Sequence, residues 1–229
     1  MSHKPTIVIS SCLLGEPVRY DGGDKRQPEL QQFLASRCNL VSLCPEMEMG
    51  LGVPRAPIQV VIVGRQYHLR SVVEPDTDYT RIAEETARKA LQKIGNIDGW
   101  IFKARSPSCG LTDTAMFDTD GQEVAKGSGL FAKHVITAMP WLPCTTELQL
   151  ESETEQKRFY EKCKILTSIN HWLNSDRSEQ SLLQMQQILK PQLPFLAAED
   201  FHIFNNKSDS TDERFYQFRN EVMVLVNSL

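Results

Sequence analysis

The chain has 229 residues, enough for one sizeable domain with a smaller appendage. Hydrophobic residues make up 41% of it and charged residues 24%, with both signs mixed, which excludes a disordered or collagen-like polymer. The formal charge of -4 gives no support to a protein that binds nucleic acids through general phosphate contacts. No run of 18 apolar residues occurs, so we expect no association with a membrane.

The cysteines and the N-terminal sequence indicate a reducing compartment. Six cysteines in a chain of this length are too sparse for a secreted disulfide scaffold. The apolar run that follows Pro5 is too short for the hydrophobic core of a signal peptide. We therefore expect a cytoplasmic protein whose cysteines are free thiols or metal ligands. They are Cys12, Cys38, Cys44, Cys109, Cys144 and Cys163.

Short apolar runs alternate with amphipathic segments through the first two thirds of the chain. In chain order we expect a strand at 5–11, a helix at 27–37, strands at 40–43, 59–64 and 67–73, a helix at 79–94 capped by Asp78, a strand at 100–102, a helix at 130–138 and a strand at 141–144. This alternation predicts an α/β fold with a mainly parallel, Rossmann-like sheet that is covered by helices on both faces.

The composition changes from about residue 151. Glycine disappears, and helical patterns occupy 153–173, 178–189 and 212–226. We therefore predict an α/β domain at 1–150 and a helical C-terminal annex at 151–229. The annex has 9 Lys or Arg against 12 Asp or Glu, a balance of -3 that does not suit an RNA-binding arm.

Three cysteines follow predicted strands. Because the carboxyl ends of parallel strands meet at one edge of a sheet, the thiols of Cys12, Cys44 and Cys109 are expected to converge there. A set of thiols without nearby histidines suits iron-sulfur or zinc. The spacings of 32 and 65 residues match no compact zinc or ferredoxin motif, so the alternative that each is a small core residue stays open.

The sequence around each of these cysteines extends into a longer motif. The motifs are Cys-Leu-Leu-Gly-x-x-Val-Arg-Tyr-Asp-Gly-Gly at 12–23, Cys-Pro-Glu-x-x-x-Gly-Leu-Gly-Val-Pro-Arg at 44–55 and Lys-Ala-Arg-Ser-Pro-Ser-Cys-Gly at 103–110. Together they resemble the bacterial thiouracil desulfurase (desulfidase) family over residues 5–144. The variant motifs are similar to those of a subgroup that is often fused to a second helical domain.

The resemblance implies a 4Fe-4S cluster held by Cys12, Cys44 and Cys109, with one open iron. In the family, the sulfur of a thiolated uracil binds this iron and leaves as sulfide after hydrolysis, without net electron transfer. The iron acts as a Lewis acid on the C–S bond. The expected substrate is therefore a small thiolated pyrimidine, namely 2- or 4-thiouracil or its nucleoside.

The resemblance also implies roles for other side chains. Glu46 is the expected catalytic acid or base, and Ser106 is expected to place the substrate or water. The expected substrate-binding residues are Arg19, Tyr20, Asp21, Arg55, Arg105 and Ser108. The alternative interpretation is that the acids and arginines are solvated or paired surface charges, and that the serines cap a turn.

Two other functions remain open. Members with the fused helical domain are associated with removing sulfur from 4-thiouridine in tRNA, but the annex here is acidic and lacks their Glu-Glu-Gly-Arg-Leu stretch, which disfavours tRNA as a partner. Many family members also carry a cysteine at the position of Val18 and a glycine at that of Met49. The third function is a non-catalytic metal-binding module. The oligomeric state is left open.

Overall fold

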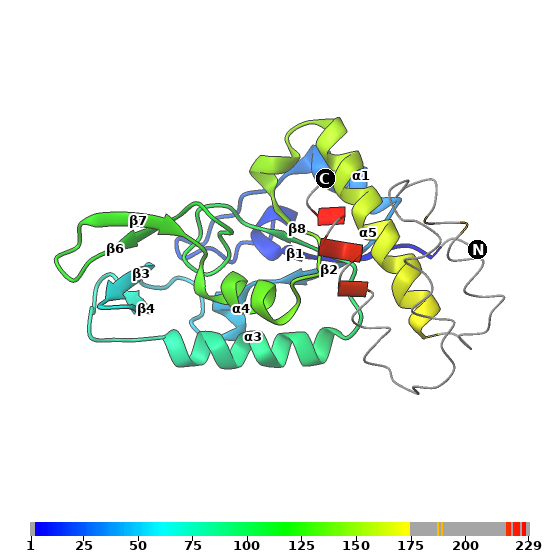
Figure 1. Cartoon of the computed structure of the whole chain (residues 1–229). Coiled ribbons are helices and arrows are strands. Elements are labelled where there is room, and N and C mark those ends of the chain that lie inside the picture. Colours follow the sequence, from blue (N-terminus) through cyan, green and yellow to red (C-terminus); the bar gives the residue numbers. More distant parts are fainter. Residues whose placement is uncertain are drawn as a thin grey trace, which may run out of the picture.

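The structure is a computed structural model. It describes residues 3–174 and, near the C-terminus, residues 187, 189, 219, 220, 222–224, 226 and 227. The described residues form an α/β fold in which two four-stranded sheets are accompanied by helices (Figure 1), so the predicted fold class is confirmed. The helices expected at 178–189 and 212–226 fall largely outside the described residues.

The first sheet is parallel throughout and has the strand order β2-β1-β5-β8. Its strands are β1 (Thr6–Ser10), β2 (Asn39–Leu43), β5 (Gly99–Phe102) and β8 (Cys144–Thr146). Every residue of β5 is buried, because apolar side chains cover both faces of the sheet. This is the parallel sheet that the sequence predicts.

The last strand of this sheet lies further along the chain than expected. The sequence favours a strand at 141–144, whereas β8 begins at Cys144. Pro140 and Pro143 flank the apolar pair on which that expectation depends, and proline has no N–H to donate to a sheet. The segment still contacts β5, because the carbonyl of Pro143 accepts the N–H of Trp100 at 2.9 Å.

The second sheet has the order β4-β3-β6-β7 and mixed strand directions. It contains β3 (Ile58–Val63), β4 (Gln66–Ser71), β6 (Thr114–Phe117) and β7 (Glu123–Gly127). β3 pairs in parallel with β6, while β3–β4 and β6–β7 are antiparallel hairpins. The sequence analysis missed the β6–β7 hairpin, since its strands are short and show no sustained alternation of apolar and polar residues.

The helices expected at 27–37, 79–94, 130–138 and 153–173 are present with closely similar bounds, whereas a short helix at 45–48 and two 3-10 turns were not predicted. The helical elements are α1 (Pro28–Ala35), α2 (Pro45–Glu48), α3 (Thr80–Ile94), α4 (Leu130–Ala138), α5 (Glu153–Leu173) and two 3-10 turns, η1 (Ser11–Leu14) and η2 (Glu147–Leu150). Asp78 lies one residue before the N-cap of α3, and its Oδ1 accepts the N–H of Thr80 at 2.8 Å. Within the described residues, no helix is both long and apolar enough to cross a membrane.

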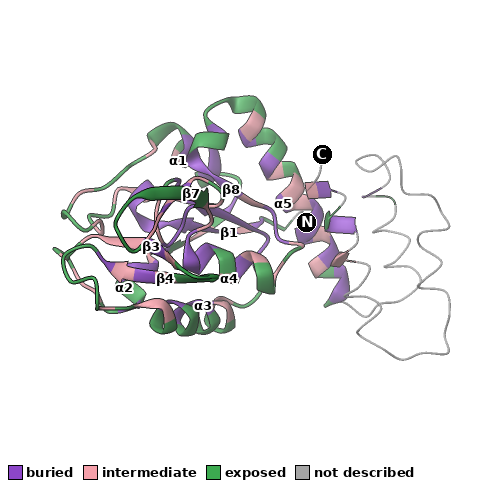
Figure 2. Ribbon diagram, turned by 60° about the vertical axis from the view of Figure 1, so that its left-hand side comes forward, coloured by how far each residue is buried: buried purple, intermediate pink, exposed green. Residues whose placement is uncertain are grey.

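Helix α5 shares its core with the parallel sheet. Phe159 and Cys163 join the apolar cluster around Ile7 and Ile101, and Leu166 and Ile169 join the cluster around Trp100 and Phe102; Figure 2 shows the buried strands and the buried side of α5. The division at residue 150 falls between η2 and this helix. It stays a prediction.

The close approach of α5 to β5 depends on Gly99. A Cβ atom at this position would lie 2.5 Å from Sγ of Cys163 and 3.1 Å from Cζ of Phe159. Both neighbours are buried, so neither can move aside freely. Gly99 therefore fixes how near the helix can pack.

We expect Gly99→Ala to lower the free energy of unfolding by about 1–3 kcal/mol, because the added methyl group overpacks this contact. In the Gly99→Ala/Cys163→Ala double variant the loss should be smaller than the sum of the two single losses, since removing Sγ makes room for the new methyl group. Denaturant unfolding of the four proteins measures this coupling. Additive losses would contradict the packing described here.

Candidate active site

The site lies where the carboxyl ends of three parallel strands meet. β1 is flanked by β2 on one side and by β5 on the other, so the loops that leave β1 and its neighbours diverge and open a crevice. A cavity of about 490 Å³ occupies this crevice. It is lined by Ser10, Ser11, Cys12, Val18, Arg19, Tyr20, Lys25, Leu43, Cys44, Pro45, Glu46, Arg55, Pro57, Ile58, Lys103, Ala104, Arg105, Ser106, Pro107 and Cys109.

The three predicted cysteines all line this cavity. Cys12 lies in η1 directly after β1, and its carbonyl accepts the N–H groups of Gly15 at 3.3 Å and Lys25 at 2.9 Å. Gly15 has a φ of 90°, a conformation that glycine adopts without strain. Cys44 directly follows β2 and is the N-cap of α2, where its carbonyl accepts the N–H of Glu48 at 3.0 Å. Backbone hydrogen bonds therefore fix both cysteines.

Cys109 reaches the cavity from a longer loop after β5. The Oγ of Ser106 accepts the N–H groups of Ser108 at 3.2 Å and Cys109 at 3.0 Å, which closes a tight turn. The carbonyl of Ser106 accepts the hydroxyl of Thr114 at 2.9 Å and thereby ties the turn to β6. Cys109 is 4% exposed.

Burial keeps all three thiols protonated in the absence of a bound cation. Burial, followed by the Glu46 carboxylate, raises the pKa of Cys12 to about 11 and that of Cys44 to about 12. Burial and Glu46 also raise the pKa of Cys109, with smaller contributions from Cys44 and Cys12. The contributions of Cys44 and Cys12 at Cys109 place the three thiols in one electrostatic environment. A metal that binds them would displace their protons.

Glu46 is the acid of the cavity. It is the second residue of α2, directly after Pro45, and it is 8% exposed. The thiol of Cys44 donates to its Oε2 at 3.3 Å. Among the described residues that line the cavity it is the only acidic side chain. A carboxyl in this place can exchange protons with a bound molecule.

Positive charge dominates the rest of the lining. Five cations line the cavity with Glu46, namely Arg19, Lys25, Arg55, Lys103 and Arg105. Nη1 of Arg55 donates to the carbonyls of Val18 at 2.9 Å and Gly52 at 2.8 Å, and this joins the loop after Cys12 to the loop after α2. Such an excess of cations offsets the charge of thiolates or of an anionic ligand.

Most of the predicted substrate-binding residues lie at the cavity. Arg19, Tyr20, Arg55 and Arg105 line it together with the predicted catalytic residue Ser106. Asp21 and Ser108 do not line it. Asp21 lies 3.6 Å from Nε of Arg19, and Ser108 is fully buried beside Gly129.

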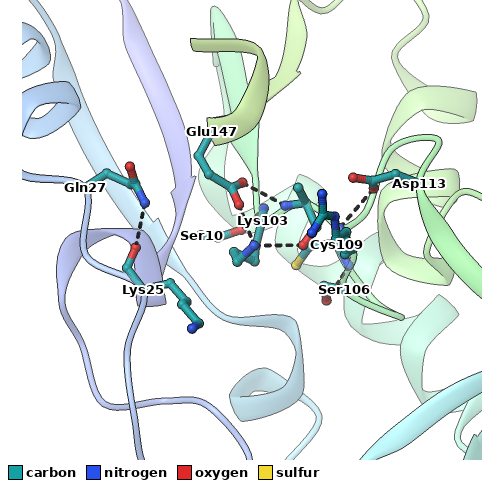
Figure 3. Close-up of polar contacts among 10 residues, drawn as sticks. Ser10, Lys25, Gln27, Lys103, Ser106, Cys109, Asp113 and Glu147 are labelled. Atoms are coloured by element: carbon teal, nitrogen blue, oxygen red, sulfur yellow. Dashed lines mark hydrogen bonds and ion pairs between the residues drawn. The ribbon is translucent and has the colours of Figure 1, made fainter. Parts of the chain in front are cut away.

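The sequence analysis missed an ion pair at the cavity wall. Nζ of Lys103 donates to Oε1 of Glu147 and, at 2.9 Å, to the carbonyl of Ala104 (Figure 3). Oε2 of Glu147 accepts the N–H of Ala104 at 2.8 Å. The two charges lie 44 residues apart in the chain, so no local motif signals the pair. At Cys12 the Lys103 ammonium lowers the pKa by more than Glu147 raises it.

The chemistry of the donor set in the cavity fits a thiolate-bound cluster. Within the part of the chain that the structure describes, no three His, Cys, Asp or Glu side chains are close enough to share one metal ion. In an iron-sulfur cluster each cysteine binds a different iron, so its ligands do not converge on one point. Three soft donors with an excess of cations suit such a group.

Three comparisons with known proteins show what the chain is similar to. The family model of 2-thiouracil desulfurase matches residues 7–147. The uncharacterized protein YbbK of Bacillus subtilis (strain 168) is 31% identical over 132 residues, which are 55% of this chain and 86% of that protein. The solved structure of the 4Fe-4S-dependent thiouracil desulfidase TudS has a TM-score of 0.50 and 30% identity, and the match covers 64% of this chain and 93% of that chain.

The matched region spans β1 to the first residue of η2 and so contains all the loops that line the cavity. It amounts to more than half of the chain. The protein therefore belongs to the 2-thiouracil desulfurase family.

Proposed function

We propose that the protein is an iron-sulfur-dependent desulfurase that hydrolyses a thiolated uracil, either 2- or 4-thiouracil or its nucleoside. The reaction exchanges sulfur for oxygen: the C=S group and one water give a C=O group and hydrogen sulfide, with no net electron transfer. The observation that carries the proposal is the convergence of three thiols and one carboxyl in a single cation-lined cavity.

Cys12, Cys44 and Cys109 are the residues that would hold a 4Fe-4S cluster, with one iron left free of protein ligands. When bound, the cluster supplies a Lewis-acidic iron that takes up the sulfur of the substrate. The name of the TudS structure and the soft donor set support this assignment. The five lining cations would balance the negative charge of the thiolates.

Glu46 is the proposed proton-transfer residue. Hydrolysis requires a group that takes a proton from water and a group that protonates the departing sulfur or the ring. The carboxyl of Glu46 lies inside the cavity, 3.3 Å from Sγ of Cys44, and can perform both transfers in turn. Its burial at 8% exposure limits competition from bulk water.

Ser106 is the proposed partner that places the substrate or the attacking water. Its Oγ already accepts two backbone N–H groups, from Ser108 and Cys109. A hydroxyl has two lone pairs and one hydrogen, so the hydrogen remains to be donated. Because Ser106 lines the cavity, a bound oxygen or ring nitrogen is a suitable acceptor.

The heterocycle is proposed to bind between the loop after β1 and the loop after β5. Tyr20 offers an aromatic face, and the guanidinium groups of Arg19, Arg55 and Arg105 attract an anionic ring. Asp21 would act through Arg19, and Ser108 through the shape of the turn before Cys109. The 490 Å³ volume is typical of pockets for small molecules.

We also propose that the enzyme is cytoplasmic. All six cysteines are free thiols, as is usual for proteins of a reducing compartment.

The function is tested by incubating anaerobically loaded protein with 2-thiouracil, with 4-thiouracil and with the nucleoside of each, in the absence of any reductant. We expect one sulfide released for each uracil formed. A fully loaded protein that releases no sulfide from either base or nucleoside would overturn the proposal.

We expect Cys12→Ala, Cys44→Ala and Cys109→Ala each to lose the cluster, because each removes one of three ligands. Iron and acid-labile sulfide analysis should give about four irons per chain in the wild type and far less in each variant. Cys38→Ala is the control, since Cys38 is also a buried cysteine but does not line the cavity. Retention of the full iron content by any of the three variants would contradict the assignment.

We expect Glu46→Gln to lower kcat by about 10²–10⁴-fold with an unchanged iron content, because the amide cannot transfer protons. Glu48→Gln is the matched control: Glu48 lies on the same helix, is exposed and does not line the cavity. Steady-state sulfide release measures both. Equal rates for the two variants would exclude Glu46 from proton transfer.

Arg105 combines a cavity-lining side chain with a strained backbone. Its φ of 59° is unfavourable for a residue with a Cβ atom, and its N–H donates to Oδ1 of Asp113 at 2.9 Å. Arg105→Gly should be more stable than Arg105→Ala by about 1 kcal/mol, because only glycine relieves the strain. Both variants should raise KM about tenfold, since both lack the guanidinium. Thermal unfolding and kinetics separate the two effects, and equal stability of the variants would contradict the strain.

A further inference from the structure

The Lys103–Glu147 ion pair lies at the wall of the cavity. A contribution to the free energy of unfolding does not explain why these two charges are buried there. The side chains of Lys103 and Glu147 are only 17% and 5% exposed. Burying two charges costs desolvation energy, and apolar replacements of such pairs are often neutral or stabilising. The location of this pair therefore suggests a role in the chemistry of the cavity.

Glu147 is held rigidly from two directions. One carboxylate oxygen accepts a hydrogen bond from the Lys103 ammonium, and the other accepts one from the N–H of Ala104 at 2.8 Å. Glu147 is the first residue of η2, a turn closed by a reciprocal pair of hydrogen bonds between Thr146 and Gln149. The carboxylate is thus a fixed anchor.

The pair is oriented with its positive end toward the cavity. Lys103 lines the cavity and Glu147 does not, and Figure 3 shows the ammonium between the Glu147 carboxylate and the loop that carries Cys109. The ammonium has three N–H groups, of which two go to Glu147 and to the carbonyl of Ala104. The third is left for a group in the cavity.

We propose that Lys103 is an active-site residue whose ammonium is the fixed counter-charge for sulfur anions in the cavity, and that Glu147 is the residue that positions it. The inference rests on the proposed function, which supplies these anions: the thiolate of Cys12 and the hydrosulfide that leaves the substrate. Lys103 forms no covalent bond and keeps its proton, so it stabilises the developing charge without entering the stoichiometry.

The first test is a double-variant cycle on the loaded enzyme. Lys103→Met should lower kcat by about 10–100-fold with a smaller change in KM, because the ammonium acts on charge that develops during the reaction. Glu147→Gln should also lower kcat. If Glu147 acts through Lys103, adding Glu147→Gln to Lys103→Met should cause no further loss, whereas additive losses would overturn the positioning role.

The second test needs no cluster. Iodoacetate is an anion and iodoacetamide is neutral, so the ratio of their alkylation rates at Cys12 in the cluster-free full chain reports the nearby charge and does not depend on the protonation of the thiol. Mass spectrometry of the Cys12 peptide should show an iodoacetate-to-iodoacetamide ratio about 3–10-fold lower in Lys103→Met than in the wild type. The control is Lys89→Met, which removes one lysine of the exposed Lys89–Glu85 pair on α3 and should leave the ratio unchanged. Equal ratios in wild type and Lys103→Met would overturn the proposal.

The two tests separate the failure of this inference from the failure of the proposed function. A wild type that releases no sulfide would overturn the desulfurase activity, and the alkylation rates would still decide the role of Lys103. If Lys103→Met leaves Glu147 uncompensated and does not fold, the Lys103→Met/Glu147→Gln variant has no buried net charge at this position. Cys12 of this variant should still show a lower iodoacetate-to-iodoacetamide ratio than in the wild type, because the ammonium is absent.

Discussion

The parallel pairing of β2, β1 and β5 determines where the chemistry of this protein can occur. Because all three strands run in one direction, their carboxyl ends lie at one edge of the sheet, and the loops that follow them share one crevice. Cys12, Cys44 and Cys109 are carried by these loops, although 97 residues separate the first from the last. Antiparallel pairing of any one strand would remove its cysteine from the site.

The same arrangement brings three buried thiols together, and the charged side chains of the cavity lining affect whether these thiols are neutral or ionised. Burial favours neutral thiols, and Glu46 strengthens that preference. Five cations on the surrounding loops act in the opposite sense, and Lys103 is the one anchored by a buried carboxylate. A cofactor bound through thiolates would therefore enter a site whose protein charge already compensates its ligands.

The sequence predicts the parallel sheet and the convergence of the thiols because both depend on local patterns. Apolar runs predict β1 and β5, helical periodicity predicts the bounds of α4 and α5, and each cysteine motif follows a strand. The β6–β7 hairpin escaped prediction, since its strands are short and its place in the sheet depends on the pairing of β6 with the distant β3. The strand expected at 141–144 was placed too early, because the pattern of apolar residues outweighed the prolines.

Features that depend on distant residues could not be predicted in this way. Nothing near Lys103 in the sequence points to Glu147, and Gly99 gives no sign of the helix that packs against it. Asp21 and Ser108 belong to the right motifs but lie outside the cavity lining, because a motif records which residues occur together and not where each side chain is placed.

The most direct test of this account is a crystal structure of the anaerobically loaded protein, with iron located by anomalous scattering. The account predicts a four-iron cluster bound by Sγ of Cys12, Cys44 and Cys109, with the fourth iron free of protein ligands and facing the cavity that contains Glu46. A single metal ion, a fourth protein ligand, or a cluster held by other cysteines would contradict it.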